Sequence, residues 1–581
     1  MEKKWDLSEL IPPPGSKGYK QFLQELEGEV KKVELVRSKL NNFTGNDLLQ
    51  VIKTKERIEE LSNRLGAYAY LGYSVDTHNS QARAFLSEME NLGADLSNRL
   101  LFFNLWFKNL DEKKARELMK AAPKYQYYLE RIRETKLYSL LENEEKIINL
   151  KSLSGTNALV KIYDLVSASL TFEMTVNGKR KALSEEELRN FAKNPDAKLR
   201  ASAYQELMGV FGKQGQVLGE VYRNIVTDWK NECLTLRKYP SSVSVRNISN
   251  DIPQESYDAL ISSVRKNAPI FEDYFKMKFK LCGVKDFSRY HIYAPYGAKE
   301  KQYSYETAVK MVMENFNKFS PKMAQLAQNL VTKNHIDVPI RKGKRSGAYC
   351  YSITPQTTPY VLLNYDGSMR NVFTLAHELG HAVHGQLYNG SILNYNAPIP
   401  VCETASIFSE MLLFDKLLDA EKDVEAKKAL LVMKIDDIYA SIQRQTYFTI
   451  FEENAHRMVG EGAGVDELKK EYAKELKEQF GSMKVPEEFS WEWVAIPHMF
   501  HSPFYCYGYA FGNLLVLALY NRYKEEGSKF IPKYLKILEY GGSERPKKML
   551  DEVGFDINSE KFWNSGFHLI GNLVNDLKRL K

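Results

Sequence analysis

The sequence predicts a mainly α-helical protein built from at least two lobes. Residues 18–150 carry helix-period patterns rich in Glu, Lys and Leu, with few glycines. The chain has 581 residues, which is more than one ordinary hydrophobic core accommodates. A further apolar helical pattern covers residues 372–387, and β structure is indicated at only two short segments.

The first β segment is a hairpin near residue 175. Alternating residues from Thr171 lead into Asn177-Gly178, the strongest short hairpin signal. Ser184 with Glu187 then resembles a capping box, which predicts that a helix starts there. We place the boundary between an N-terminal helical lobe, residues 1–185, and a second domain, residues 186–581, at this point.

The second β segment precedes an amphipathic helix. Residues 357–365 predict a buried strand, and Asp366-Gly367-Ser368 supplies a turn and an N-cap. One side of the helix that follows is apolar and the other carries histidines. The apolar side holds Val372, Leu375, Ala376, Leu379, Val383 and Leu387, and the opposite side holds His377, His381 and His384.

His377, Glu378 and His381 form an H-E-x-x-H sequence on this helix. Residues four apart lie one above the other on a helix, so both histidines can offer a ring nitrogen to one zinc ion. Glu378 then lies where it can take a proton from a metal-bound water. This pattern is the signature of zinc metalloproteases, and we therefore expect one Zn²⁺ per chain. Two surface histidines beside a glutamate are the alternative, but a chance match is rare in a chain with 10 His.

A catalytic zinc site needs a third protein ligand. We expect Glu403, because Glu403, Ser406 and Glu410 share one face of a predicted helix. Glu410 could accept the spare N–H of a ligand histidine and fix its tautomer. In the alternative interpretation Glu403 is a solvated helix charge, and Glu410 and His384 have no role at the metal.

Two other ligand sets are excluded. The metzincin extension requires Gly at position 384 and His at position 387, whereas the chain has His384 and Leu387. Cys402 directly precedes Glu403, but on a helix its side chain points about 100° away from that of Glu403, so we exclude Cys402 as a ligand.

A second group of polar and aromatic residues lies at 498–509. Ser502 followed by Pro503 predicts an N-cap and the first residue of a helix. The group contains two histidines and two tyrosines that could stabilise an oxyanion, namely His498, His501, Tyr505 and Tyr509. Aromatic core packing is the alternative for any single tyrosine, since the chain has 35 Tyr.

Composition excludes several classes of protein. The net charge of +7 is mild for this length, so we expect no nucleic-acid partner. No apolar stretch is long enough to span a bilayer, and the N-terminus carries no secretory signal. Five scattered cysteines without a C-x-x-C pair indicate free thiols and a cytoplasmic location.

The chain resembles oligoendopeptidase F, in the thimet oligopeptidase superfamily of zinc metallopeptidases. The resemblance lies in residues 364–368 and 373–384, in the Glu403-x-x-Ser406-x-x-x-Glu410 spacing, and in the opening at residues 5–8. It implies a helical, two-lobed, clam-like fold with a deep central channel and zinc-dependent endopeptidase action on short oligopeptides. Residues 347–351 resemble the segment that binds the substrate backbone.

Carried over residue by residue, the resemblance implies a set of roles. His377, His381 and Glu403 would be ligands and Glu378 the catalytic acid/base, while Gly347, Ala348 and Tyr349 would bind substrate. His498 and Tyr509 match the family's donor segment better than His501 and Tyr505.

Two rival functions and the metal's identity stay open. A zinc carboxypeptidase or dipeptidyl-carboxypeptidase would use the same metal set but need a cation for the substrate's C-terminus, and Arg345 lies near the predicted recognition segment. A non-catalytic zinc-stabilised peptide-binding protein would not need Glu378. Cobalt or manganese could occupy the same ligands, and the sequence favours no oligomeric state.

Overall fold

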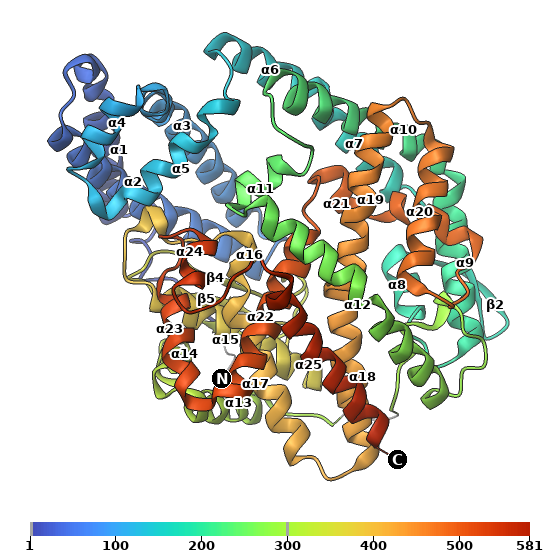
Figure 1. The fold of residues 1–581 in the computed structure, drawn as a ribbon. Helices are drawn as coiled ribbons and strands as arrows, with labels where there is room; N and C mark the ends of the chain where they lie inside the picture. The colour runs from blue at the N-terminus through green and yellow to red at the C-terminus, as the bar shows by residue number, and fades with distance from the viewer. Residues whose placement is uncertain (1–3, 298–300, 581) are drawn as a thin grey trace. The chain divides into compact units, whose positions relative to one another are not determined.

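The computed structural model describes residues 4–297 and 301–580. Across these ranges the chain is mainly helical, and its strands form one two-stranded and one three-stranded sheet (Figure 1). The predicted helical fold with a small sheet beside the H-E-x-x-H helix is confirmed. No helix in the described part of the chain has the length and apolar character that crossing a bilayer requires.

The chain divides into two compact units, each assembled from three segments. Unit 1 contains residues 1–136, 300–416 and 522–554, and unit 2 contains residues 137–299, 417–521 and 555–581. The chain first changes unit at residues 136–137, whereas the sequence places a boundary at 185/186. That boundary stays a prediction about folding domains.

Unit 1 begins with helices that form their own hydrophobic core. The helices are α1 (Lys17–Leu35), α2 (Gly45–Val75), α3 (Ser80–Asn109), α4 (Glu112–Met119) and α5 (Gln126–Glu134). Apolar residues recur at helical spacing on α1, where Phe22, Leu26, Val30 and Val33 are buried against α2 and α3. The helical pattern predicted over residues 18–150 is confirmed.

The rest of unit 1 surrounds the small sheet. Its elements are α13 (Tyr305–Phe319), α14 (Pro321–Thr332), β3 (Ile336–Asp337), β4 (Tyr349–Tyr351), β5 (Tyr360–Leu362), α15 (Met369–Leu387), α16 (Ile399–Cys402), the start of α17 (Thr404–Ala420), α23 (Ile531–Glu539) and α24 (Pro546–Asp551). β5 is central, parallel to β3 and antiparallel to β4. α15 packs against β4 and β5 and carries the H-E-x-x-H residues.

The turn between β5 and α15 follows the sequence prediction. Gly367 has a positive φ of 89°, which a residue without Cβ adopts readily. Ser368 caps the helix by accepting a hydrogen bond from the Asn371 N–H. The six residues predicted on the apolar side of α15 are all buried. The helix is therefore fixed along its whole length.

The opening segment of the chain supports the same sheet. Trp5 is buried and meets the Tyr360 ring edge-on, with centroids 6.0 Å apart. The Tyr360 hydroxyl donates to the Asp6 carbonyl at 2.8 Å. The opening motif therefore braces the strand that leads into α15.

Unit 2 consists of helices and one hairpin. Its elements are α6 (Glu142–Ser154), α7 (Thr156–Ala168), β1 (Phe172–Val176), β2 (Lys179–Leu183), α8 (Glu185–Phe191), α9 (Ala197–Lys213), α10 (Gly215–Trp229), α11 (Ser244–Asn250), α12 (Gln254–Leu281), α18 (Val424–Ser441), α19 (Gln443–Gly460), α20 (Val465–Phe480), α21 (Pro497–His501), α22 (Tyr507–Glu526) and α25 (Glu560–Arg579). The predicted hairpin is confirmed, with positive φ at Asn177 and Gly178. The capping box at Ser184 is also present.

The helix start predicted at Ser502-Pro503 is wrong. Ser502 follows the short α21, and α22 begins only at Tyr507. Ser502 already leaves helical geometry, with φ of -154° and ψ of 79°, and Phe504 has φ of 58°, a left-handed conformation that a helix starting at Pro503 could not contain. Tyr505 therefore lies in a turn.

Candidate metal centre

Three predicted ligands converge in unit 1. His377 and His381 come from successive turns of α15, and Glu403 lies between α16 and α17. Glu403 Oε2 is 3.3 Å from His377 Nε2 and 3.2 Å from His381 Nε2. One donor atom from each residue lies within 4.8 Å of the other two. Ligands about 2.1 Å from a tetrahedral zinc ion lie roughly 3.4 Å apart, so this donor set fits the ion.

Gly380 explains how Glu403 reaches the histidines. A Cβ at Gly380 would lie 2.6 Å from the Ala405 carbonyl oxygen and 2.7 Å from Ser406 Cα. The glycine inside the H-E-x-x-H sequence therefore lets the backbone of α17 approach α15 closely. The motif itself permits any residue at this position, so the sequence pattern alone does not reveal this requirement.

Glu410 and Ser406 each form a hydrogen bond with one of the predicted ligands. Glu410 Oε1 lies 2.6 Å from His377 Nδ1, which leaves Nε2 of that ring facing Glu403. The Ser406 hydroxyl donates to Glu403 Oε2 at 2.6 Å. Partners of this kind orient metal ligands and fix the histidine tautomer.

The carboxylates around His377 make the site electronegative. Burial lowers the pKa of His377, but Glu410, Glu403 and Glu378 outweigh it and raise the pKa to about 9. Burial also acts to raise the pKa of Glu403, yet the hydrogen bond and charge of His381, with His377 and Ser406, hold it well below its usual range. The site thus attracts positive charge, as a cation site must.

Glu378 is buried beside the two histidines. Burial raises the pKa of its carboxyl, while His377 and His381 oppose the shift. A raised carboxyl pKa is suited to a group that both accepts and returns a proton near neutral pH.

His384 and Cys402 lie beside the cluster. Burial and the neighbouring His381 lower the pKa of His384 to about 4, so its ring is neutral at pH 7, and it hydrogen-bonds to the Cys402 backbone. The Cys402 thiol donates to the Ile399 carbonyl at 3.1 Å. It stays a prediction that His384 and Glu410 support the metal ligands.

The predicted substrate-binding residues lie at an edge of the sheet. Tyr349 begins β4, whose one strand partner among the described residues is β5. Gly347 has φ of 80°, and its carbonyl accepts from Asn364 Nδ2 at 2.8 Å. An edge strand with one unpaired side can bind an extended peptide, so Gly347, Ala348 and Tyr349 stay candidates for that role.

The 498–509 residues belong to unit 2 and fall into two groups. His498 Nε2 is 3.3 Å from the Tyr509 hydroxyl, and the His498 and Tyr505 rings stack with centroids 5.6 Å apart. His501 instead meets Asp164 Oδ1 at 2.7 Å. The structure thus gathers His498, Tyr505 and Tyr509 and directs His501 elsewhere. Their catalytic roles stay predictions.

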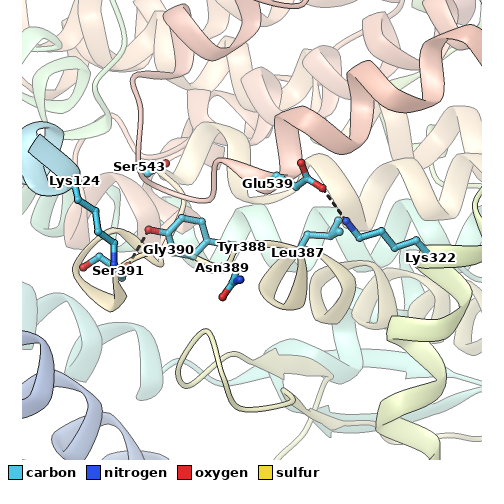
Figure 2. A pocket seen from close by; sticks show the side chains of 9 residues that line it. All are labelled: Lys124, Lys322, Leu387, Tyr388, Asn389, Gly390, Ser391, Glu539 and Ser543. Atoms are coloured by element: carbon cyan, nitrogen blue, oxygen red, sulfur yellow. Dashed lines mark hydrogen bonds and ion pairs between the residues drawn. The ribbon is translucent and has the colours of Figure 1, made fainter.

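Unit 1 also contains a pocket of about 520 Å³ (Figure 2). It is lined by Lys124, Lys322, Leu387, Tyr388, Asn389, Gly390, Ser391, Glu539 and Ser543. Lys322 donates to Glu539 at 2.8 Å, and the Tyr388 hydroxyl donates to the Ser391 carbonyl at 2.9 Å. None of these residues is a predicted site residue.

Two histidines and a carboxylate around one point, with a buried glutamate beside the first histidine, are the arrangement of a metallohydrolase. Comparison with known proteins narrows this class. The profile of Peptidase family M3 matches residues 190–569, and that of Oligopeptidase F matches residues 106–172. The chain belongs to peptidase family M3, in its oligoendopeptidase F group, and is a metalloendopeptidase.

Relatives align over nearly the whole chain. An oligoendopeptidase F homolog from Borreliella burgdorferi is 29% identical over 99% of this chain and 98% of its own length. Oligopeptidase PepF from Bacillus subtilis is 25% identical over 100% of this chain and 87% of its own length. A Chlamydophila abortus crystal structure superposes with a TM-score of 0.91 and 25% identity, over 100% of this chain and 98% of that one.

Proposed function

We propose that this chain is a zinc-dependent endopeptidase that hydrolyses internal bonds of short oligopeptides. The convergence of His377, His381 and Glu403, with Glu410 hydrogen-bonded to His377, is the observation that carries the proposal. His and carboxylate donors in this number suit zinc with one coordination position left for substrate or water. The peptide substrate class follows from the family.

When bound, a zinc ion lowers the pKa of a coordinated water towards 7, which supplies a nucleophile at neutral pH. Glu378 accepts the proton of the attacking water and delivers it to the leaving amine nitrogen. Its burial and raised pKa support both transfers.

The remaining residues bind and orient the peptide. The edge of β4 at Tyr349, with Ala348 directly before it, would pair with the substrate backbone. His498 and Tyr509 are the proposed donors to the oxyanion, ahead of His501 and Tyr505. The proposal that these four residues stabilise the oxyanion rests on the sequence resemblance. The Tyr509→Phe variant tests it.

The exopeptidase alternative requires a cation for the substrate's C-terminus. The candidate is Arg345, whose guanidinium lies 5.4 Å from the centroid of the Tyr70 ring and donates to the Tyr70 hydroxyl. Cleavage of an end-blocked peptide, described below, distinguishes the two actions. The five cysteines are all free thiols, which supports a reducing, cytoplasmic location as part of the proposal.

Two measurements test the proposal together. Metal analysis of the purified protein is expected to give about one zinc per chain. Hydrolysis of a peptide blocked at both ends is expected to stop with a chelator and return with zinc. An intact end-blocked peptide beside a cleaved unblocked one would show an exopeptidase, and activity unaffected by chelation would refute metal dependence.

A further inference from the structure

The turn that presents the 498–509 residues alternates between buried anchors and exposed side chains. Met499, Phe500, Pro503, Phe504, Cys506 and Tyr507 are buried, whereas His498, His501, Tyr505 and Tyr509 are half-buried or exposed. The anchors therefore determine where the exposed side chains point. The residues that hold these anchors in place have no role in the site described above.

Phe504 has the one left-handed backbone conformation in the described residues of this turn. Its φ of 58° is rarely adopted by residues with a Cβ, so surrounding contacts must hold it. Its N–H donates to Glu452 Oε1 on α19 at 2.8 Å, and the Glu452 side chain is fully buried. The residue directly before Tyr505 is thus fixed by a carboxyl group in the core of unit 2.

Arg246 on α11 holds the other side of the turn. Its guanidinium donates to the Ser502 hydroxyl at 2.8 Å and to the Pro503 carbonyl at 3.1 Å. Four residues further along α11, Asn250 donates to the Tyr507 hydroxyl at 2.9 Å. The turn is therefore bound at Ser502, Pro503, Phe504 and Tyr507 by groups outside it.

Glu452 acts as a hydrogen-bond acceptor more than as a charge. Burial raises its pKa to about 8, against the opposing effects of the Phe504 N–H and Arg246. Glu453 adds to the shift, and Tyr222 and Cys506 also face the carboxyl. At pH 7 the neutral acid predominates, so glutamine is a close chemical substitute.

We propose that Glu452 and Arg246 are positioning residues that fix the 502–504 turn and thereby orient Tyr505 and Tyr509 for the reaction. The inference rests on the proposed function, because it assumes that the 498–509 segment acts on the bound peptide. Displacement of a catalytic group by about 1 Å can cost roughly a hundredfold in rate. Neither residue itself needs to touch substrate.

The test compares Glu452→Ala, Glu452→Gln and Arg246→Ala with Glu475→Ala in the zinc-loaded enzyme. Glu475 is a matched control: it is a buried carboxyl on α20 whose partners are Asn454 and Arg265. Glu452→Ala and Arg246→Ala are expected to lower kcat about 10- to 100-fold at unchanged zinc content. Glu452→Gln should restore kcat because its amide oxygen accepts the same N–H, and Glu475→Ala should lower stability alone.

A double-mutant cycle with Tyr509→Phe adds a readout that a general loss of stability would not change. If Glu452 acts through this tyrosine, the two effects on kcat are less than additive. Additive effects, or a Glu452→Ala variant that behaves like Glu475→Ala, would overturn the inference. If Glu452→Ala does not fold, the half-buried Arg246 carries the same test. Wild-type enzyme without zinc-dependent hydrolysis would instead overturn the proposed function, and this inference with it.

Discussion

Gly380→Ala tests whether close approach of α15 and α17 builds the metal centre. The added methyl would lie 2.6 Å from the Ala405 carbonyl oxygen, where ordinary contacts begin at 3.4 Å, so the two backbones must separate by about 0.8 Å. Metal–ligand distances tolerate only about ±0.2 Å. We therefore expect zinc affinity to fall at least about tenfold.

The same substitution changes stability by two opposing effects. Overpacking costs about 1–3 kcal/mol, and replacing a helical glycine with alanine gains about 1 kcal/mol. The control is Gly72→Ala in α2, where nothing beyond the backbone of the same helix and the two adjacent residues lies within 4 Å of the new methyl. This control should gain about 0.5–1 kcal/mol and bind zinc normally.

Competition with a chromophoric chelator measures the zinc affinity of both variants, and thermal unfolding measures their stability. Wild-type zinc affinity in Gly380→Ala would refute the argument that the glycine brings Glu403 to the histidines. Equal affinity losses in both variants would point to a general effect of alanine and refute it as well.

Four further predictions concern single groups. Glu378→Gln should keep stoichiometric zinc but lose at least about 10²–10⁴-fold in kcat, and near-normal activity would reject it as acid/base. Glu410→Ala should weaken zinc binding about 10- to 100-fold by releasing His377, as equilibrium dialysis would show. Tyr509→Phe should lower kcat about 10²–10³-fold if its hydroxyl meets the oxyanion, whereas an unchanged kcat removes it from the site. The pKa of Glu452 rises from 4.5 to about 8 on folding, so its contribution to stability is complete below pH 4.5 and lost as pH rises through 8. Chemical denaturation should therefore show wild type losing stability relative to Glu452→Gln across that range, and parallel pH profiles would contradict the shift.

The elements around the metal centre could be predicted because local signals and tertiary packing agree there. The apolar stripe of α15, the Gly367 turn and the Ser368 cap are each local patterns, and each specifies the same helix. Glu403 and Glu410 could be named because they share one face of a predicted helix with Ser406, in a spacing that also resembles a known family. Their distances to His377 could be known only from the folded structure.

The 502–507 turn could not be predicted for a physical reason. Ser-Pro normally begins a helix, and only contacts from distant residues overrule that preference. Glu452 and Arg246 supply those contacts from positions about 50 and 250 residues away in the sequence. The need for glycine at position 380 could not be predicted for the same reason, because it comes from contact with α17, which lies outside the motif.

The division of unit 1 into three chain segments has a consequence during synthesis. Helices α1 to α5 bury a core of their own, drawn almost entirely from residues 11–132, and can form it early. The metal helix α15, however, packs against α23, at residues 531–539. At about 5–20 residues per second, a ribosome needs roughly half a minute to two minutes to reach that point. Nascent chains that stop short of it would lack the packing that α23 supplies to α15, which makes truncated products natural clients for chaperones.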